Sequence, residues 1–464
     1  MSVLLDRKTG EVVVAFAGDG GGIAELTWGQ REIWAAFELA GHSIGLGGSM
    51  AVPPETTVDD VVAVLRFSMS RHQALRTRFH LDDRGRPDQQ VVAEAGEVTV
   101  DLFDVDGDDE PGEFAAALRW EYEDRDFDYA HEWPVRLGVV RRRGVVTHVV
   151  VMYCHLIIDG YGMDAMNRDL VHLDRATGQA TGPVAGIQPL DQARAQASTA
   201  GERQSDAAMR YWEPLLRNVS ARRFPFPGPS SPRTPRYWQV GLISSAMPLA
   251  ITAIAGRTGV DQAQVLLAAH AVSLARVTGI NPSLIRVVVS NRFRPGFAES
   301  VSVVNQTGLC VIDVADVSFD EAVRRAWRSF LGAGLHAYYD PRRLHRLVAD
   351  LSRERGEDID LACFLNDARR PHRREEPAPV LTEAALRAAR AATQVRWVYR
   401  RDQPNERMFL HINDVPDRID LVLCGDTWHI SPADLEACAL GLEDIVVRAA
   451  FDANAATGVR ATAA

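Results

Sequence analysis

Apolar residues recur at helical spacing in some segments of the chain and form continuous β-branched runs in others. In the N-terminal part, the helical period predicts helices over 27–39, 58–72 and 111–124. Runs rich in β-branched residues predict strands over 11–16, 75–80, 89–92, 135–141 and 145–155. The last run, VVTHVVVMYCH, is apolar almost throughout, so we expect a central strand that is buried on both faces. His155 therefore stands where a buried strand is predicted to stop.

A second set of elements follows a segment rich in Gly, Pro, Ala and Thr at 178–189, which has the composition of a linker. Beyond it, the patterns predict helices over 192–216, 249–257, 261–278, 320–333 and 342–353, and a last helix that begins at Ser431. Strands are predicted over 284–290, 308–313, 361–366, 396–399, 408–414 and 419–424. Because strands and helices are similar in number on both sides of the linker, we expect two α/β lobes, 1–182 and 183–464.

Composition excludes several classes of function. The chain has 464 residues, 46% of them hydrophobic and 24% charged, which is typical of a folded protein with a large core. Its net charge of −11 argues against binding to nucleic acid or to an anionic membrane. Lys8 is the only lysine, so neither a Walker A loop nor a pyridoxal Schiff base can form beyond the N-terminal segment.

The expected compartment is the cytoplasm. No apolar run approaches the ~20 residues of a membrane span, and the N-terminus lacks the pattern of a signal peptide. The five cysteines are far apart and never form a CxxC pair, which is typical of a reduced cytosolic chain.

The segment Cys154–Gly160 (CHLIIDG) is the sharpest candidate for chemistry. A tight turn after a strand exposes a side chain at the sheet edge, and a glycine lets the backbone bend there. A histidine in that place can accept a proton near neutral pH or hold a substrate by a hydrogen bond. A metal site is disfavoured, since strand alternation puts His148 and His155 on opposite faces. Cys154 is expected to be a small buried hydrophobe rather than a nucleophile.

This segment resembles the HHxxxDG signature of the condensation domains of non-ribosomal peptide synthetases, which share the fold of chloramphenicol acetyltransferase. Other landmarks of that family occur in the same order and extend the resemblance over nearly the whole chain. They are Leu26–Trp34 (LTWGQREIW) with its Gln30 and Trp34, Arg71–Phe79 (RHQALRTRF), Ser290-Asn291-Arg292 with Val303-Val304-Asn305, and Phe364–Arg369 (FLNDAR).

The resemblance implies a mixed α/β fold of two chloramphenicol acetyltransferase-like lobes, arranged as a V with a central tunnel. It implies that His155 is catalytic, that Gly160 allows a backbone N–H to approach the oxyanion, and that Asp159 pairs with Arg292 to support the active-site loop. Cys154 replaces the first histidine of the signature. The DxxxxD pattern of heterocyclising relatives is absent, so ring formation is disfavoured.

The expected function is that of a free-standing condensation enzyme, which forms an amide between a thioester-bound acyl group and an amine in natural-product biosynthesis. The donor would arrive on the phosphopantetheine arm of an acyl or peptidyl carrier protein, or on coenzyme A, and we expect no permanently bound cofactor or metal. The arginines of 369–374 are expected to form a solvated loop, and the alternative is a basic patch that meets the acidic surface of a carrier protein. Two alternatives stay open: an ester-forming acyltransferase of the same fold, and a catalytically silent module that docks a partner enzyme.

Overall fold

The computed structural model describes residues 4–461 except 106, 108, 176, 225–232, 371–380 and 404. It divides into two compact units, one of residues 1–203 with 290–306 and the other of residues 204–289 with 307–464. The predicted boundary at 182 and 183 falls inside the first unit, and a segment from the later half of the chain, 290–306, returns to that unit. This return places Arg292 in the same unit as His155.

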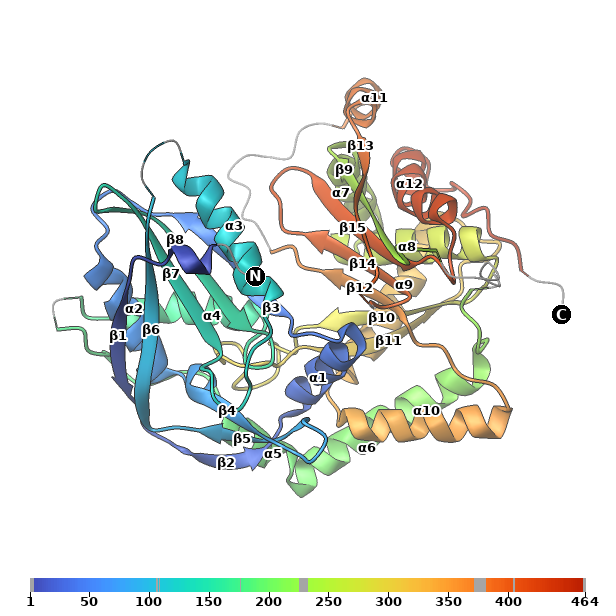
Figure 1. The fold of residues 1–464 in the computed structure, drawn as a ribbon. Coiled ribbons are helices and arrows are strands. Elements are labelled where there is room, and N and C mark those ends of the chain that lie inside the picture. Colours follow the sequence, from blue (N-terminus) through green and yellow to red (C-terminus); the bar gives the residue numbers. More distant parts are fainter. Residues whose placement is uncertain are drawn as a thin grey trace. The chain divides into compact units, whose positions relative to one another are not determined.

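A five-stranded sheet forms the centre of the first unit, with the strand order β1-β6-β7-β8-β3 (Figure 1). Its strands are β1 (Gly10–Ala17), β6 (Ala95–Asp104), β7 (Val135–Arg142), β8 (Val145–Cys154) and β3 (Gly45–Ala51). Only β6 and β7 pair in parallel. The predicted position of β8 as an inner strand is confirmed, because β7 and β3 flank it, whereas β3 is an edge strand.

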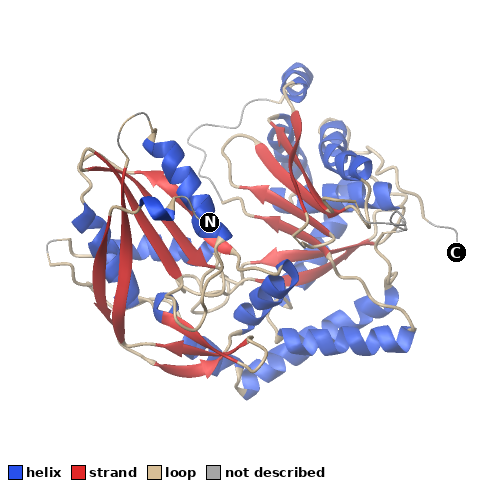
Figure 2. Cartoon of the chain, in the orientation of Figure 1, coloured by secondary structure: helices blue, strands red, loops and turns tan. Residues whose placement is uncertain are grey.

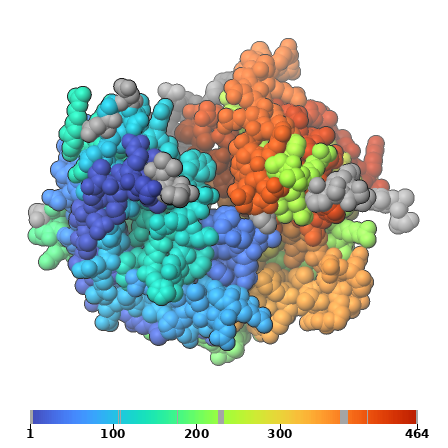
Figure 3. Space-filling view, viewed as in Figure 1, coloured from blue at the N-terminus to red at the C-terminus, as the bar shows by residue number. Residues whose placement is uncertain are grey.

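A smaller antiparallel sheet completes the strands of the first unit, in the order β2-β5-β4. Its strands are β2 (Gly22–Glu25), β5 (Pro87–Val92) and β4 (Thr77–Leu81). The helices are α1 (Trp28–Ala40), α2 (Val58–Arg71), α3 (Pro111–Asp124), α4 (Gly160–Asp169) and α5 (Pro189–Gln196), with 3-10 turns η1 (Leu5–Arg7), η2 (Gln73–Arg76) and η3 (Leu170–His172). The core between sheet and helices is aliphatic and aromatic, and it includes Cys154. The N-terminal residues, dark blue in Figure 3, lie on the surface of this unit.

The second unit is built on a seven-stranded mixed sheet in the order β11-β10-β12-β14-β15-β9-β13. Its strands are β9 (Tyr237–Ser244), β10 (Ser283–Val289), β11 (Gln306–Ile312), β12 (Cys363–Asp367), β13 (Gln394–Arg401), β14 (Met408–Asn413) and β15 (Ile419–Asp426). The helices, blue in Figure 2, are α6 (Thr199–Asn218), α7 (Ala246–Thr258), α8 (Gln262–Thr278), α9 (Phe319–Leu335), α10 (Pro341–Arg355), α11 (Glu383–Ala391) and α12 (Pro432–Ala449).

Two apolar clusters hold the second unit together. The larger one joins the sheet to α7, α8, α9 and α12, and the smaller one joins it to α6 and α10. The second unit is therefore a sheet with helices packed on it in two separate cores.

Most elements predicted from the sequence occur within a few residues of their expected bounds, and α3 has the predicted bounds of 111 and 124. The predicted helix over 192–216 is two helices, α5 and α6, and the predicted strand over 75–80 begins as the 3-10 turn η2. Strands β2, β6 and β9 and helix α11 were not expected from the pattern. Within the described ranges no helix is long and apolar enough to span a membrane.

Candidate active site

His155 lies directly after the last residue of β8, as the sequence predicts. Its backbone N–H donates to the carbonyl of Ile44 at 2.9 Å, so the ladder between β8 and β3 continues one step beyond the strands. The side chain is half-buried. An inner strand with a neighbour on each side therefore fixes the backbone that carries this imidazole.

The ring of His155 is held by one hydrogen bond, which determines where its proton sits. Nδ1 lies 2.9 Å from the carbonyl oxygen of Ile158. Because a carbonyl can only accept, Nδ1 must carry the hydrogen, and the neutral ring then has its lone pair on Nε2. Burial lowers the pKa of His155 below its usual value, which favours the neutral ring. The site thus presents an unprotonated imidazole nitrogen near neutral pH.

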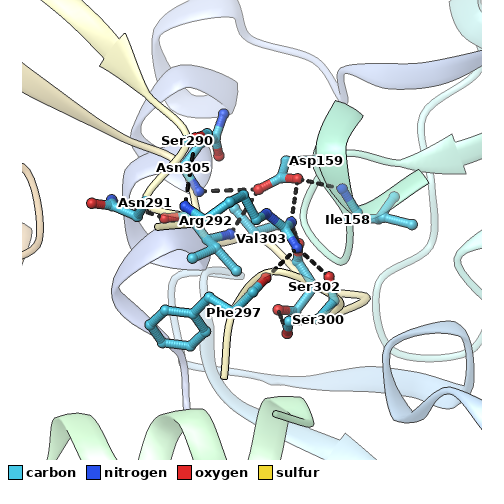
Figure 4. Close-up of polar contacts among 12 residues, drawn as sticks. Ile158, Asp159, Ser290, Asn291, Arg292, Phe297, Ser300, Ser302, Val303 and Asn305 are labelled. Atoms are coloured by element: carbon cyan, nitrogen blue, oxygen red, sulfur yellow. Dashed lines mark hydrogen bonds and ion pairs between the residues drawn. The ribbon is translucent and has the colours of Figure 1, made fainter. Parts of the chain in front are cut away.

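Asp159 is buried, and its carboxylate accepts four hydrogen bonds. Figure 4 shows it beside Arg292 and Asn305. Oδ1 accepts from the N–H of Gly162 at 2.7 Å, which caps α4, and from Nη2 of Arg292 at 2.6 Å. Oδ2 accepts from the N–H groups of Val304 at 2.8 Å and Asn305 at 3.0 Å. One carboxylate therefore ties the turn after His155 to the segment 290–306.

Arg292 is the centre of that segment, which folds around its guanidinium. Nη1 donates to the carbonyls of Phe297, at 3.0 Å, and Ser300. Nη2 donates to the carbonyl of Ser302 at 3.1 Å, in addition to Asp159. The side chain of Arg292 is 9% exposed and that of Asp159 is 2% exposed, so the two charges form a buried, hydrogen-bonded ion pair.

Gly160 is the first residue of α4. The first four N–H groups of a helix have no acceptor within it, so the N–H of Gly160 is one that the helix leaves unsatisfied. That N–H comes five residues after His155 along the chain, at the positive end of the helix dipole.

Two residues outside the predicted motifs also support the site. A Cβ at Gly162 would stand 2.9 Å from Ile158 and 3.0 Å from the carbonyl of Ser302, so the close contact of α4 with 290–306 needs a glycine there. Gln192 of α5 donates to the carbonyl of Val303 at 3.2 Å and accepts from the hydroxyl of Ser302 at 3.0 Å. Of these residues, only Gly162 has a signal in the local sequence, because it stands two residues after Gly160. The partners of Gln192 are over 100 positions away, so no local pattern indicates them.

Cys154 points into the core of the first unit and is 1% exposed. Burial raises the pKa of its thiol to about 12, so the sulfur stays protonated at neutral pH. Within the ranges that the structure describes, no group of three or more His, Cys, Asp or Glu side chains is placed to hold a metal ion.

The remaining motif residues near the N-terminus make structural contacts. Gln30 and Thr27 form a capping box that starts α1. Arg71 forms an ion pair with Asp169 at the end of α4, where Nε2 of His72 also lies 3.1 Å from the carboxylate.

The second unit holds the last motif. Asn366 contacts Nδ1 of His411 at 3.2 Å, and Asp367 pairs with Arg369. Of the predicted basic patch at 369–374, residues 371–374 lie outside the described residues.

Fold and site together define the class of protein. The mixed α/β sheets have the fold that the motifs imply, and the first unit holds a histidine at the end of an inner strand and an aspartate paired with an arginine 133 positions away. Residues 22–366 match the family model of the condensation domain. The chain belongs to the condensation domain family, and the predicted fold class is confirmed.

Three known proteins illustrate the likeness. Phosphinothricin tripeptide synthetase PhsC of Streptomyces viridochromogenes is 28% identical over 291 residues, which cover 60% of this chain and 26% of PhsC. The X-domain from teicoplanin biosynthesis superposes with a TM-score of 0.70 at 19% identity, over 97% of this chain and 99% of that one. SgcC5 from Streptomyces globisporus gives a TM-score of 0.68 at 17% identity, over 93% of this chain and 99% of SgcC5. The chain thus matches about a quarter of the peptide synthetase.

Proposed function

We propose that this protein is an acyl-transferring condensation enzyme that forms an amide bond. It joins an acyl group, held as a thioester on a phosphopantetheine arm, to the amine of an acceptor. The carrier is an acyl or peptidyl carrier protein or coenzyme A, and the enzyme acts as a separate chain without a resident cofactor. Membership of the condensation domain family and the likeness to PhsC support this function.

The observation that carries the proposal is the orientation of the His155 ring. With Nδ1–H bonded to the carbonyl of Ile158, the lone pair on Nε2 is available to an amine at the reaction centre. Attack of an amine on the thioester carbonyl creates a positively charged nitrogen, which must lose a proton before the thiolate leaves. A neutral imidazole is suited to accept that proton or to orient the amine by a hydrogen bond.

Asp159 and Arg292 are proposed as positioning residues. Their ion pair is buried, and the carboxylate of Asp159 accepts hydrogen bonds from α4 and from the segment 290–306, so we assign the pair to supporting the turn that carries His155. Gly160 is proposed to offer its backbone N–H to the oxyanion of the tetrahedral intermediate.

The test offers the purified protein an acyl-N-acetylcysteamine thioester and two acceptors that differ only in carrying an amine or a hydroxyl. Products are detected by intact mass. Amide formed at least tenfold faster than ester supports the proposal. Preferential ester formation would assign the alternative ester-forming activity, and no transfer to either acceptor would contradict both.

A further inference from the structure

The outer edge of β3 is an unprotected strand edge beside His155. β3 pairs with β8 on one side only, and no other strand among the described residues pairs with it. Edge strands are commonly guarded by lysine, proline, bulges or inward-pointing charges. The seven residues of β3, GLGGSMA, contain none of these, and Ser49, Met50 and Ala51 are exposed.

The register determines which backbone groups of β3 face outward. Val52 donates to Thr147, and His155 donates to Ile44, so the even-numbered residues of β3 exchange hydrogen bonds with β8. The N–H and C=O groups of the odd-numbered residues therefore point away from β8. These residues are Gly45, Gly47, Ser49 and Ala51. They form a row of donors and acceptors that repeats about every 6.8 Å along the edge.

The edge begins at the active site. Gly45 lies opposite Cys154, and Ile44 lies opposite His155, so the N-terminal end of β3 is level with His155 and the free edge runs from that level away from it, one strand further out than β8. Gly48 lies opposite Val151, which is four residues before His155, so Gly48 and His155 are on the same face of the sheet. A Cβ at Gly48 would meet nothing within 4 Å, so there is open space on that face. Close packing therefore does not require a glycine at position 48, and the absence of a side chain there leaves this face of the sheet uncovered.

We infer that the outer edge of β3 is the docking strand for an extended peptidyl donor, which runs antiparallel to β3 with its C-terminal thioester carbonyl at the His155 end. The inference rests on the proposed function and adds the strand edge on which the donor binds. The direction follows because the reacting carbonyl is the C-terminus of the donor and the His155 end is the N-terminal end of β3.

A peptide fits this edge better than the other amide-bearing part of the substrate. A peptide in β conformation presents both an N–H and a C=O to the edge at every second residue, which matches the repeat of the odd-numbered positions. The two amides of the pantetheine arm are separated by an additional methylene, so their spacing does not match that repeat. A second copy of the chain is the competing occupant.

The experiment measures binding, so that it does not depend on turnover. The probe is a tetrapeptidyl pantetheine in which a stable amide replaces the thioester, and four further probes each carry one N-methyl group. Loss of one hydrogen bond is expected to weaken binding roughly threefold to tenfold. We expect this loss at two alternate positions of the peptide and no change at the two others. Equal effects at all four positions, or no binding of the parent probe, would overturn the inference.

A pair of protein variants tests the same contact from the other side. Ser49→Pro removes an outward N–H that β8 does not use, and proline is tolerated at such edge positions. Ser49→Ala keeps the N–H and is the matched control. We expect roughly threefold to tenfold weaker binding for S49P and unchanged binding for S49A, with both variants melting like the wild type. If S49P unfolds, the N-methyl scan decides alone.

The outcomes separate the inference from the proposed function. Transfer of a simple acyl group with a flat N-methyl scan would refute the docking strand and leave the proposed function intact. An alternating scan without any transfer would leave the docking strand intact and contradict the proposed function. A concentration-dependent dimer that S49P dissociates, together with no binding of the probe, would assign the edge to a second copy and overturn the inference.

Discussion

Replacing Asp159 by alanine is expected to destabilise the protein far more than an ordinary loss of a surface charge. The substitution removes the cap of α4, which contributes about 1 kcal/mol. It also leaves the guanidinium of Arg292 buried without its counter-charge. Breaking a buried ion pair in this way costs about 3–5 kcal/mol. Since the two effects share one carboxylate, we expect a total of about 3–5 kcal/mol rather than their sum.

The assay is urea denaturation of purified protein, followed by tryptophan fluorescence and far-UV circular dichroism. Asp191→Ala is the control, since Asp191 forms an exposed pair with Arg194 that contributes at most about 1 kcal/mol. Asp159→Asn keeps an oxygen for the cap but loses the charge, so its midpoint should lie between those of the wild type and Asp159→Ala.

The result that would refute this reasoning is an Asp159→Ala protein with wild-type stability and a large loss of turnover. Asp159 would then act on the substrate or on the proton of His155 directly. Expression of soluble protein with the same urea midpoint as Asp191→Ala would be sufficient to exclude the positioning role.

Three further predictions follow from other contacts. Gly162→Ala should lower the melting temperature measured by calorimetry, because the new Cβ would stand 3.0 Å from the carbonyl of Ser302. Gly48→Ala is the control and should leave the melting temperature unchanged, because nothing lies within 4 Å of a Cβ at that position. Burial lowers the pKa of His270 to about 4, so between pH 6.5 and 4 the unfolded chain protonates this histidine while the folded chain does not. The free energy of unfolding should therefore be highest above pH 6.5 and fall by roughly 3 kcal/mol as the pH drops toward 4. The urea midpoint of His270→Gln should lose most of this pH dependence. The lowered pKa of His155 keeps its neutral form below pH 6.5, so a profile of kcat/KM should stay flat there and fall only at more acidic pH, and a fall beginning above pH 7 would contradict the assignment.

The pattern of residues predicts long, strongly periodic elements well. Helix α3 and strand β8 agree with the sequence pattern almost to the residue, because the apolar positions of α3 keep one helical period and β8 is apolar almost throughout. Strand β6 (AGEVTVDLFD) was missed although its core-facing residues alternate, because acidic and small residues interrupt the apolar signal. Strand β9 (YWQVGLIS) was missed because a glutamine and a glycine interrupt its apolar residues.

The site was predictable only as far as local motifs reach. The strand end fixes the place of His155, and the resemblance brought Arg292 to Asp159 across 133 positions. The orientation of the imidazole depends on the carbonyl of Ile158, which no side-chain pattern encodes. The contacts of Gln192 with Ser302 and Val303 arise from the return of 290–306 to the first unit, and a linear pattern contains no signal for such a return.

The most direct test of the account compares acyl transfer by the wild type and by His155→Ala, with products followed by intact mass. The donor is the acyl-N-acetylcysteamine thioester, the acceptor is the amine, and calorimetry checks that both proteins melt alike. The account predicts transfer by the wild type and a loss of at least a hundredfold in the variant. Equal transfer by a well-folded His155→Ala protein would contradict the central role of this imidazole.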